Sequence, residues 1–143
     1  MEDSLIRECK ESDKSDLIEL FFEFGRYLEK LDKECLNLVT VPEDYGQKFY
    51  NKMIDEVKTK KGKIFVLENN QKLVGFIAGV IIEVGSNDDE LDCKPHRMGR
   101  VIELFINEKY RGIGYGSILK SLVRIRKHTS IIRNLAFRIG VLI

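Results

Sequence analysis

Apolar residues recur with the period of a helix in two stretches of the first half of the chain. After an N-cap at Ser12 and Asp13, spacings of three and four predict one apolar stripe along a helix. This stripe is formed by Leu17, Leu20, Phe21, Phe24, Leu28 and Leu31. A second helix is expected to start at Thr40-Val41-Pro42, because proline at the first helical position loses no hydrogen bond. Its stripe is Phe49, Met53 and Val57, and it is expected to end at Lys61-Gly62.

Short β-branched and apolar runs predict strands on both sides of these helices. Leu5 to Cys9 is short and weakly alternating, which favours a first strand. Ile64 to Glu68 and Leu73 to Val84 are expected to form two antiparallel strands, joined by a tight hairpin at Asn69-Asn70-Gln71. Gly75 and Gly79 within the second run indicate a bulge or a close approach by another backbone.

The pattern changes again after residue 84. Gly85 to Gly99 is polar and is expected to be an exposed loop, followed by a strand at Val101 to Ile106. Helical spacing then returns at Ile118, Leu119, Leu122 and Val123. The order β-α-α-β-β-β-α-(β) predicts an α+β fold (α/β three-layer), with a mixed, mainly antiparallel sheet flanked by helices.

Composition limits the classes of protein that fit. With 143 residues, 43% hydrophobic and 33% charged, the chain is expected to be one globular domain over residues 1–143. The acidic, polar N-terminus and the lack of any apolar run near ~20 residues predict a cytoplasmic protein with no membrane partner. Cys9, Cys35 and Cys93 form no C-x-x-C pair, so reduced thiols and no metal site are expected.

The net charge of +1 hides an asymmetry. Residues 117–143 hold six basic residues and no acidic residue. A basic end is compatible with nucleic-acid binding. However, apolar residues interleave with these charges and no series of stacking aromatics accompanies them, which disfavours nucleic acid as a partner.

The stretch from 101 to 123 carries the chemistry. A buried strand leads into the turn Arg111-Gly112-Ile113-Gly114-Tyr115-Gly116, and an amphipathic helix leaves it. Glycines let successive amide groups converge, and a helix N-terminus adds partial positive charge, which predicts a phosphate site. A P-loop would close with Gly-Lys-Ser/Thr, and a dinucleotide fingerprint would have glycine where Ser117 stands, so ATP, GTP and NAD are disfavoured.

The remaining pattern, R-x-x-G-x-G, together with the order of elements, resembles the GCN5-related N-acetyltransferase (GNAT) superfamily over about residues 4 to 127. The resemblance implies an acyl-CoA N-acyltransferase-like fold with acetyl-CoA as cosubstrate. It also implies that backbone amides of the turn hold the CoA pyrophosphate and that the main chain of the preceding strand end pairs with the pantetheine arm. The implied binding residues are Leu104, Phe105, Ile106, Arg111, Gly112, Ile113, Gly114, Tyr115, Gly116 and Ser117.

Acyl transfer to an amine needs a base, because most alkylamines are protonated at pH 7. Glu103 lies within an apolar strand, and similar acetyltransferases often place a glutamate on this strand. It is therefore the candidate base, unless it points into solvent or pairs with Arg100. His96 is the competing base because imidazole titrates near neutrality, although a plain surface histidine also fits its polar surroundings.

The resemblance implies transfer of an acetyl group from acetyl-CoA to a primary amine of a small molecule or a protein, by direct attack in a ternary complex. Two other functions stay open: a non-catalytic CoA-binding or scaffold domain, and a nucleic-acid-binding module that uses the basic tail. Residues from about 128 to 143 lack the Asn-x-x-Ala motif and the Phe-Tyr pair of the family. We therefore expect a shortened or altered C-terminus and an open sheet edge, which favours pairing of Ile139–Ile143 with another chain as a homodimer.

Overall fold

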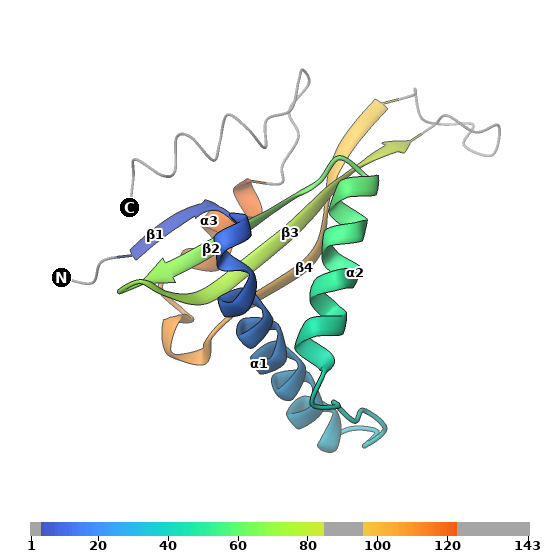
Figure 1. Cartoon of the computed structure of the whole chain (residues 1–143), viewed down its shortest axis with the longest axis vertical. Helices are drawn as coiled ribbons and strands as arrows, with labels where there is room; N and C mark the ends of the chain where they lie inside the picture. The colour runs from blue at the N-terminus through green and yellow to red at the C-terminus, as the bar shows by residue number, and fades with distance from the viewer. Residues whose placement is uncertain (1–3, 85–95, 123–143) are drawn as a thin grey trace. The chain divides into compact units, whose positions relative to one another are not determined.

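The computed structural model describes residues 4–84 and 96–122, which Figure 1 traces from the N-terminus onward. Two compact units are present. One runs from Lys10 to Asp55, and the other combines residues 4–9 with the described residues of 56–84 and 96–122. Cys93, the predicted final strand and the segment Ile139–Ile143 lie outside the described residues.

The described elements follow the predicted α+β order as far as the third helix. In chain order they are β1 (Ser4–Glu8), the 3-10 helix η1 (Glu11–Asp13), α1 (Lys14–Lys33), α2 (Tyr45–Thr59), β2 (Lys63–Asn69), β3 (Lys72–Val84), β4 (His96–Ile106), the 3-10 helix η2 (Glu108–Tyr110) and α3 (Tyr115–Ser121). The four strands form one antiparallel sheet in the order β1-β2-β3-β4 (Figure 1).

The hairpin between β2 and β3 confirms the turn expected from the sequence. Asn70 and Gln71 have positive φ angles of 49° and 65°. Positive φ at both central residues is what a type I′ hairpin turn requires, because its twist then matches that of the two strands. The turn fixes the register, in which Asn69 pairs with Lys72.

Two irregularities interrupt the sheet near the glycines of β3. Between β3 and β4, Ala78 pairs with Glu103 and Gly79 pairs with Val101, so Ile102 is the additional residue of a bulge. Between β2 and β3, the register shifts where Leu67 pairs with Gly75. A Cβ atom at Gly75 would lie 3.1 Å from the Phe105 carbonyl oxygen. The predicted bulge and the predicted close backbone approach are therefore both confirmed.

One face of the sheet is covered by α3. Its core consists of Ile6, Phe65, Leu67, Val74, Ile77, Leu119 and Leu122, all buried. Leu104 and Ile106 of β4 pack against this core, as do Tyr110 and Tyr115. Leu119 and Leu122 are fully buried, so the short α3 is held to the sheet by its apolar side.

The helical unit, Lys10–Asp55, has an aromatic core. Phe21 meets Phe49 edge to face at 4.8 Å between ring centroids, and Tyr45 stacks on Phe49 at 5.6 Å. Leu17, Leu20, Phe21 and Phe24 of the predicted α1 stripe are buried. The stripe is longer than its buried part, because Leu28 and Leu31 are 37% and 45% exposed.

Two predicted boundaries are wrong. The second helix begins at Tyr45 instead of at Thr40-Val41-Pro42, because the Pro42 carbonyl accepts a hydrogen bond from the Tyr45 amide at 3.1 Å. This bond spans three residues and closes a turn that leads into the helix. The fourth strand begins at His96, within the segment expected to be a loop.

β4 starts early because it pairs with β3, which is a long strand. β3 continues to Val84, and β4 pairs with it from His96 onward, so polar residues extend the ladder beyond the apolar run. Arg97 and Glu83, which face each other in this register, form an ion pair of 3.3 Å. Cross-strand pairs of opposite charge stabilise such exposed sheet ends modestly.

Among the described residues, no helix is long and apolar enough to cross a membrane. No group of three or more His, Cys, Asp or Glu side chains in the described ranges is arranged to hold a metal ion. Within residues 4–84 and 96–122, Cys9 and Cys35 are not joined by a disulfide.

Candidate functional site

The end of β4 is tied to the sheet by Asn107. Its amide donates a hydrogen bond to the Val74 carbonyl at 2.7 Å, which completes the pairing with β3. Its side-chain oxygen accepts a hydrogen bond from the Lys109 amide at 3.0 Å and so caps η2. The chain therefore turns away from the sheet directly after Ile106.

Arg111 folds back over the strand that it follows. Its Nε atom donates to the Ile106 carbonyl at 2.7 Å, and its Cζ atom lies 5.5 Å from the centroid of the Phe105 ring. A guanidinium over an aromatic face is attracted by the ring quadrupole. The entrance to the glycine turn is thus held by one side chain that contacts two residues of β4.

The glycine turn itself consists of exposed main chain. Gly112 and Gly114 have φ angles of 80° and 100°, which side chains rarely adopt, and a Cβ atom at either position would have no heavy atom within 4 Å. At Gly116, by contrast, a Cβ atom would lie 3.7 Å from Cδ1 of Ile106, toward the core. The backbone at Gly112 and Gly114 is therefore accessible to a ligand.

The turn ends at the N-terminus of α3. Gly114 is the N-cap, and its carbonyl accepts a hydrogen bond from the Ile118 amide at 3.2 Å. The first amides of a helix have no intrahelical acceptor and carry partial positive charge. The segment from Arg111 to Ser117 thus brings a cation, exposed glycine backbone and a helix start together, an arrangement that suits a phosphate group.

Glu103 lies on the same strand but on its other face. It pairs with Ala78 directly beside the bulge at Ile102, and its side chain is half-buried. By strand alternation it shares a face with Phe105, whereas Leu104 and Ile106 point to the face that α3 covers. The rise of a strand puts Glu103 about 10 Å from Ile106. Among the described residues, β4 is the edge strand of the sheet. Side chains on both faces of β4 therefore border the same open edge.

His96 is remote from this region. It is the first residue of β4 and pairs with Val84. Along an extended strand, it lies about 30 Å from Ile106. The structure therefore brings the turn residues and Leu104–Ile106 together, but it does not bring His96 to them.

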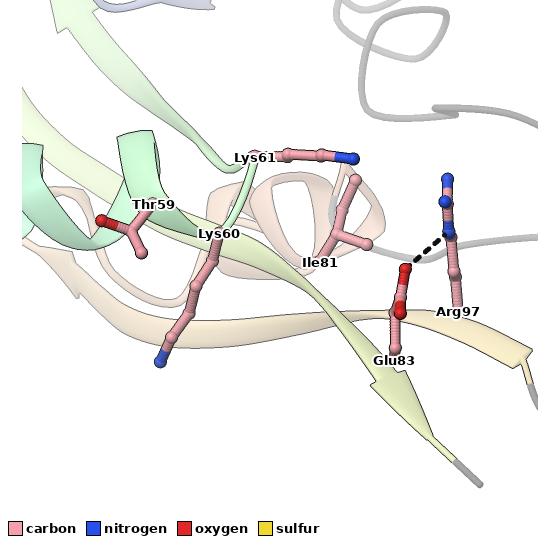
Figure 2. Close-up of a pocket in the computed structure, with 6 residues that line it drawn as sticks. All are labelled: Thr59, Lys60, Lys61, Ile81, Glu83 and Arg97. Carbon is pink, nitrogen blue, oxygen red and sulfur yellow. Dashed lines mark ion pairs between the residues drawn. The ribbon is translucent and has the colours of Figure 1, made fainter. Parts of the chain in front are cut away.

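A shallow pocket of about 220 Å³ lies at that same far end of β4. Figure 2 shows its lining, which consists of Thr59, Lys60, Lys61, Ile81, Glu83 and Arg97. The charged side chains of the Arg97–Glu83 pair are 63% and 61% exposed. The pocket is thus a solvated surface feature at the opposite end of β4 from the glycine turn.

Sequence reasoning missed a buried polar contact beneath the turn. The Tyr110 hydroxyl donates to the side-chain oxygen of Asn69 at 3.2 Å, and Asn69 is only 3% exposed. An asparagine beside a hairpin turn reads as a turn residue in the sequence. Only the pairing of strands reveals that it is buried.

Comparison with known proteins identifies the fold. The model of the Acetyltransferase (GNAT) family matches residues 23–132, which is more than half of the chain. The chain belongs to the GNAT acetyltransferase family. The predicted resemblance and the predicted α+β fold are thereby confirmed, and membership of the family supports acetyl transfer at a general level.

Solved structures of GNAT-like proteins share this fold at low sequence identity. An acetyltransferase from Vibrio fischeri matches with a TM-score of 0.54 and 20% identity, over 82% of this chain and 80% of that one. A GNAT-family acetyltransferase from Staphylococcus aureus Mu50 matches with a TM-score of 0.51 and 23% identity, over 85% and 63% of the two chains.

A ribosomal-protein-alanine N-acetyltransferase from Brucella melitensis biovar Abortus 2308 is a third such structure. It matches with a TM-score of 0.59 and 13% identity, over 96% of this chain and 74% of that one. No curated protein sequence matches the chain significantly. At these identities the structures show only the fold that this GNAT protein shares with them.

Proposed function

We propose that this chain transfers the acetyl group of acetyl-CoA to a primary amine, carried by a small molecule or a protein, by direct attack in a ternary complex. The observation that supports this is the exposed glycine main chain between the end of edge strand β4 and the start of α3. Membership of the GNAT family supports the same reaction class.

The proposed CoA site uses main chain more than side chains. Backbone amides from Gly112 to Ser117 face the pyrophosphate, and the lack of a β-carbon at Gly112 and Gly114 leaves room for it. The Arg111 amide already donates to the Glu108 carbonyl, so Arg111 contributes through its side chain. The edge of β4 at Leu104, Phe105 and Ile106 pairs with the amide groups of pantetheine in the manner of an added strand. The fit is favourable because backbone donors and the Arg111 charge both complement a diphosphate.

Glu103 is the proposed base. A neutral amine nitrogen attacks the thioester carbonyl, the new C–N bond forms, and the C–S bond breaks to release the CoA thiolate. Glu103 takes the proton that the amine loses, either directly or through one water. A main-chain N–H of β4 stabilises the developing oxyanion. Glu103 is preferred to His96 because it lies much closer along β4 to the proposed pantetheine contacts.

Binding of acetyl-CoA is the first test. Acetyl-CoA should raise the thermal midpoint of the protein, and NAD or ATP at equal concentration should not. Gly114→Glu should abolish the shift, because it places a strained side chain and a negative charge at the open turn. Gly116→Ala is the matched control and should keep the shift, since its Cβ atom has room beside Ile106. Equal shifts for wild type and Gly114→Glu would refute the site.

Catalysis needs a separate measurement. Release of free CoA thiol with a panel of primary amines is expected for an enzyme and not for a domain that only binds CoA. Binding of acetyl-CoA without thiol release across amines, amino acids and peptides would refute the transfer reaction and leave the binding site standing.

A further inference from the structure

Three polar side chains from separate segments meet beneath the start of the glycine turn. The Tyr110 hydroxyl donates to Oδ1 of Asn69 at 3.2 Å, and Nδ2 of Asn69 donates to Oγ of Ser4 at 2.8 Å. Asn69 and Ser4 are 3% and 5% exposed. Buried amides need such partners, because water is not there to replace them.

The sheet fixes two members of this group. Ser4 and Asn69 are paired residues of β1 and β2, so their side chains share one face. This face also carries Ile6 and Leu67, which belong to the core beneath α3. Asn69 is therefore held by the strand on which it sits, by a hydrogen bond from its own amide group and by the hairpin that follows it.

The third member directly precedes the turn. Tyr110 is the last residue of η2 and directly precedes Arg111 and Gly112. Gly112 and Gly114 have no side chains, and a Cβ atom at either position would meet no heavy atom within 4 Å, so side-chain packing does not fix these two residues. The path of the turn must therefore be set at its two ends, by the packing of α3 at one end and by Tyr110 and Arg111 at the other.

We propose that Tyr110 and Asn69 are positioning residues for acetyl-CoA, because their hydrogen bond holds the entrance of the glycine turn against the sheet. This inference rests on the proposed CoA site. Without the bond, the turn samples more conformations in the free protein, and the cost of ordering it reduces affinity. Neither side chain needs to touch the ligand for this effect.

Isothermal titration with acetyl-CoA tests the proposal. Tyr110→Phe removes only the hydroxyl, and the Kd should rise about three- to tenfold, the range that corresponds to one hydrogen bond. The KM for acetyl-CoA should rise in parallel, with kcat unchanged for any amine that is accepted. Asn69→Ala removes the acceptor instead and should weaken binding similarly. The double variant should be no weaker than the worse single variant, because both changes remove the same bond.

Ser4→Ala is the matched control. It removes the other hydrogen bond of Asn69 and leaves the Tyr110 contact, so it should lower the thermal midpoint but change the Kd less than about twofold. Wild-type affinity in folded Tyr110→Phe, or equal losses in Tyr110→Phe and Ser4→Ala, would overturn the positioning role. Failure of the wild-type protein to bind acetyl-CoA would instead overturn the proposed function itself.

Discussion

Nε of Arg111 donates a 2.7 Å hydrogen bond to the carbonyl oxygen of Ile106. This bond joins the first residue of the glycine turn to the last residue of β4. The same guanidinium lies over the ring of Phe105. Arg111 therefore contributes to the proposed site as a structural clamp as well as a positive charge. A substitution that keeps the positive charge distinguishes these two roles.

Arg111→Lys should weaken acetyl-CoA binding although the charge is kept. Lysine carries a compact ammonium group in place of the planar guanidinium, so the Nε bond to Ile106 is lost and the cation–π contact with Phe105 changes. We expect a free energy of unfolding about 1 kcal/mol lower, together with a higher Kd. Chemical denaturation and titration measure the two effects. Lys109→Ala is the control, since it removes a nearby exposed charge and keeps its backbone bond to Asn107; an equal loss of affinity there would show that charge alone matters.

Glu103→Gln should lower kcat and leave the KM for acetyl-CoA nearly unchanged. The substitution keeps the shape of the side chain but removes its ability to take a proton, and a positioned base contributes about 10²- to 10⁴-fold. Thiol release at saturating acetyl-CoA measures the effect. Glu108→Gln alters an exposed carboxylate of η2 and should have wild-type kcat. A Glu103→Gln protein as fast as wild type would show that another group, or water alone, accepts the proton.

The sequence predicted the order of elements and the glycine turn because both depend on local pattern. Apolar spacing located α1, and the Asn69–Gln71 break located the hairpin. The start of β4 at His96 was missed because pairing with β3 overrides the polar character of that segment. Gly75 and Gly79 indicated an irregularity in this part of the sheet, but the sequence did not show that the additional residue is Ile102 of β4, because Ile102 is one apolar residue among several in that strand.

Leu119→Ala should destabilise the sheet unit and also weaken acetyl-CoA binding. Leu119 is fully buried between α3 and the sheet, so truncation costs about 2–5 kcal/mol and loosens the helix at the end of the turn. Thermal denaturation with and without acetyl-CoA measures both effects. Ile113→Ala is the matched control, because this aliphatic side chain is 60% exposed and its loss should change stability by less than about 0.5 kcal/mol. Equal stability of the two variants would contradict the observed packing of α3.

Gln71→Gly should stabilise the protein. Gln71 adopts a φ of 65° in the hairpin, where a side chain is strained and glycine is not. Relief of this strain outweighs the added flexibility of the unfolded chain, and we expect a gain of about 0.5–1 kcal/mol by urea denaturation. The same change at Gln47, an exposed residue inside α2, should cost about 1 kcal/mol, because glycine is a poor helix former. A loss of stability in Gln71→Gly would show that its side chain makes contacts that outweigh the backbone strain.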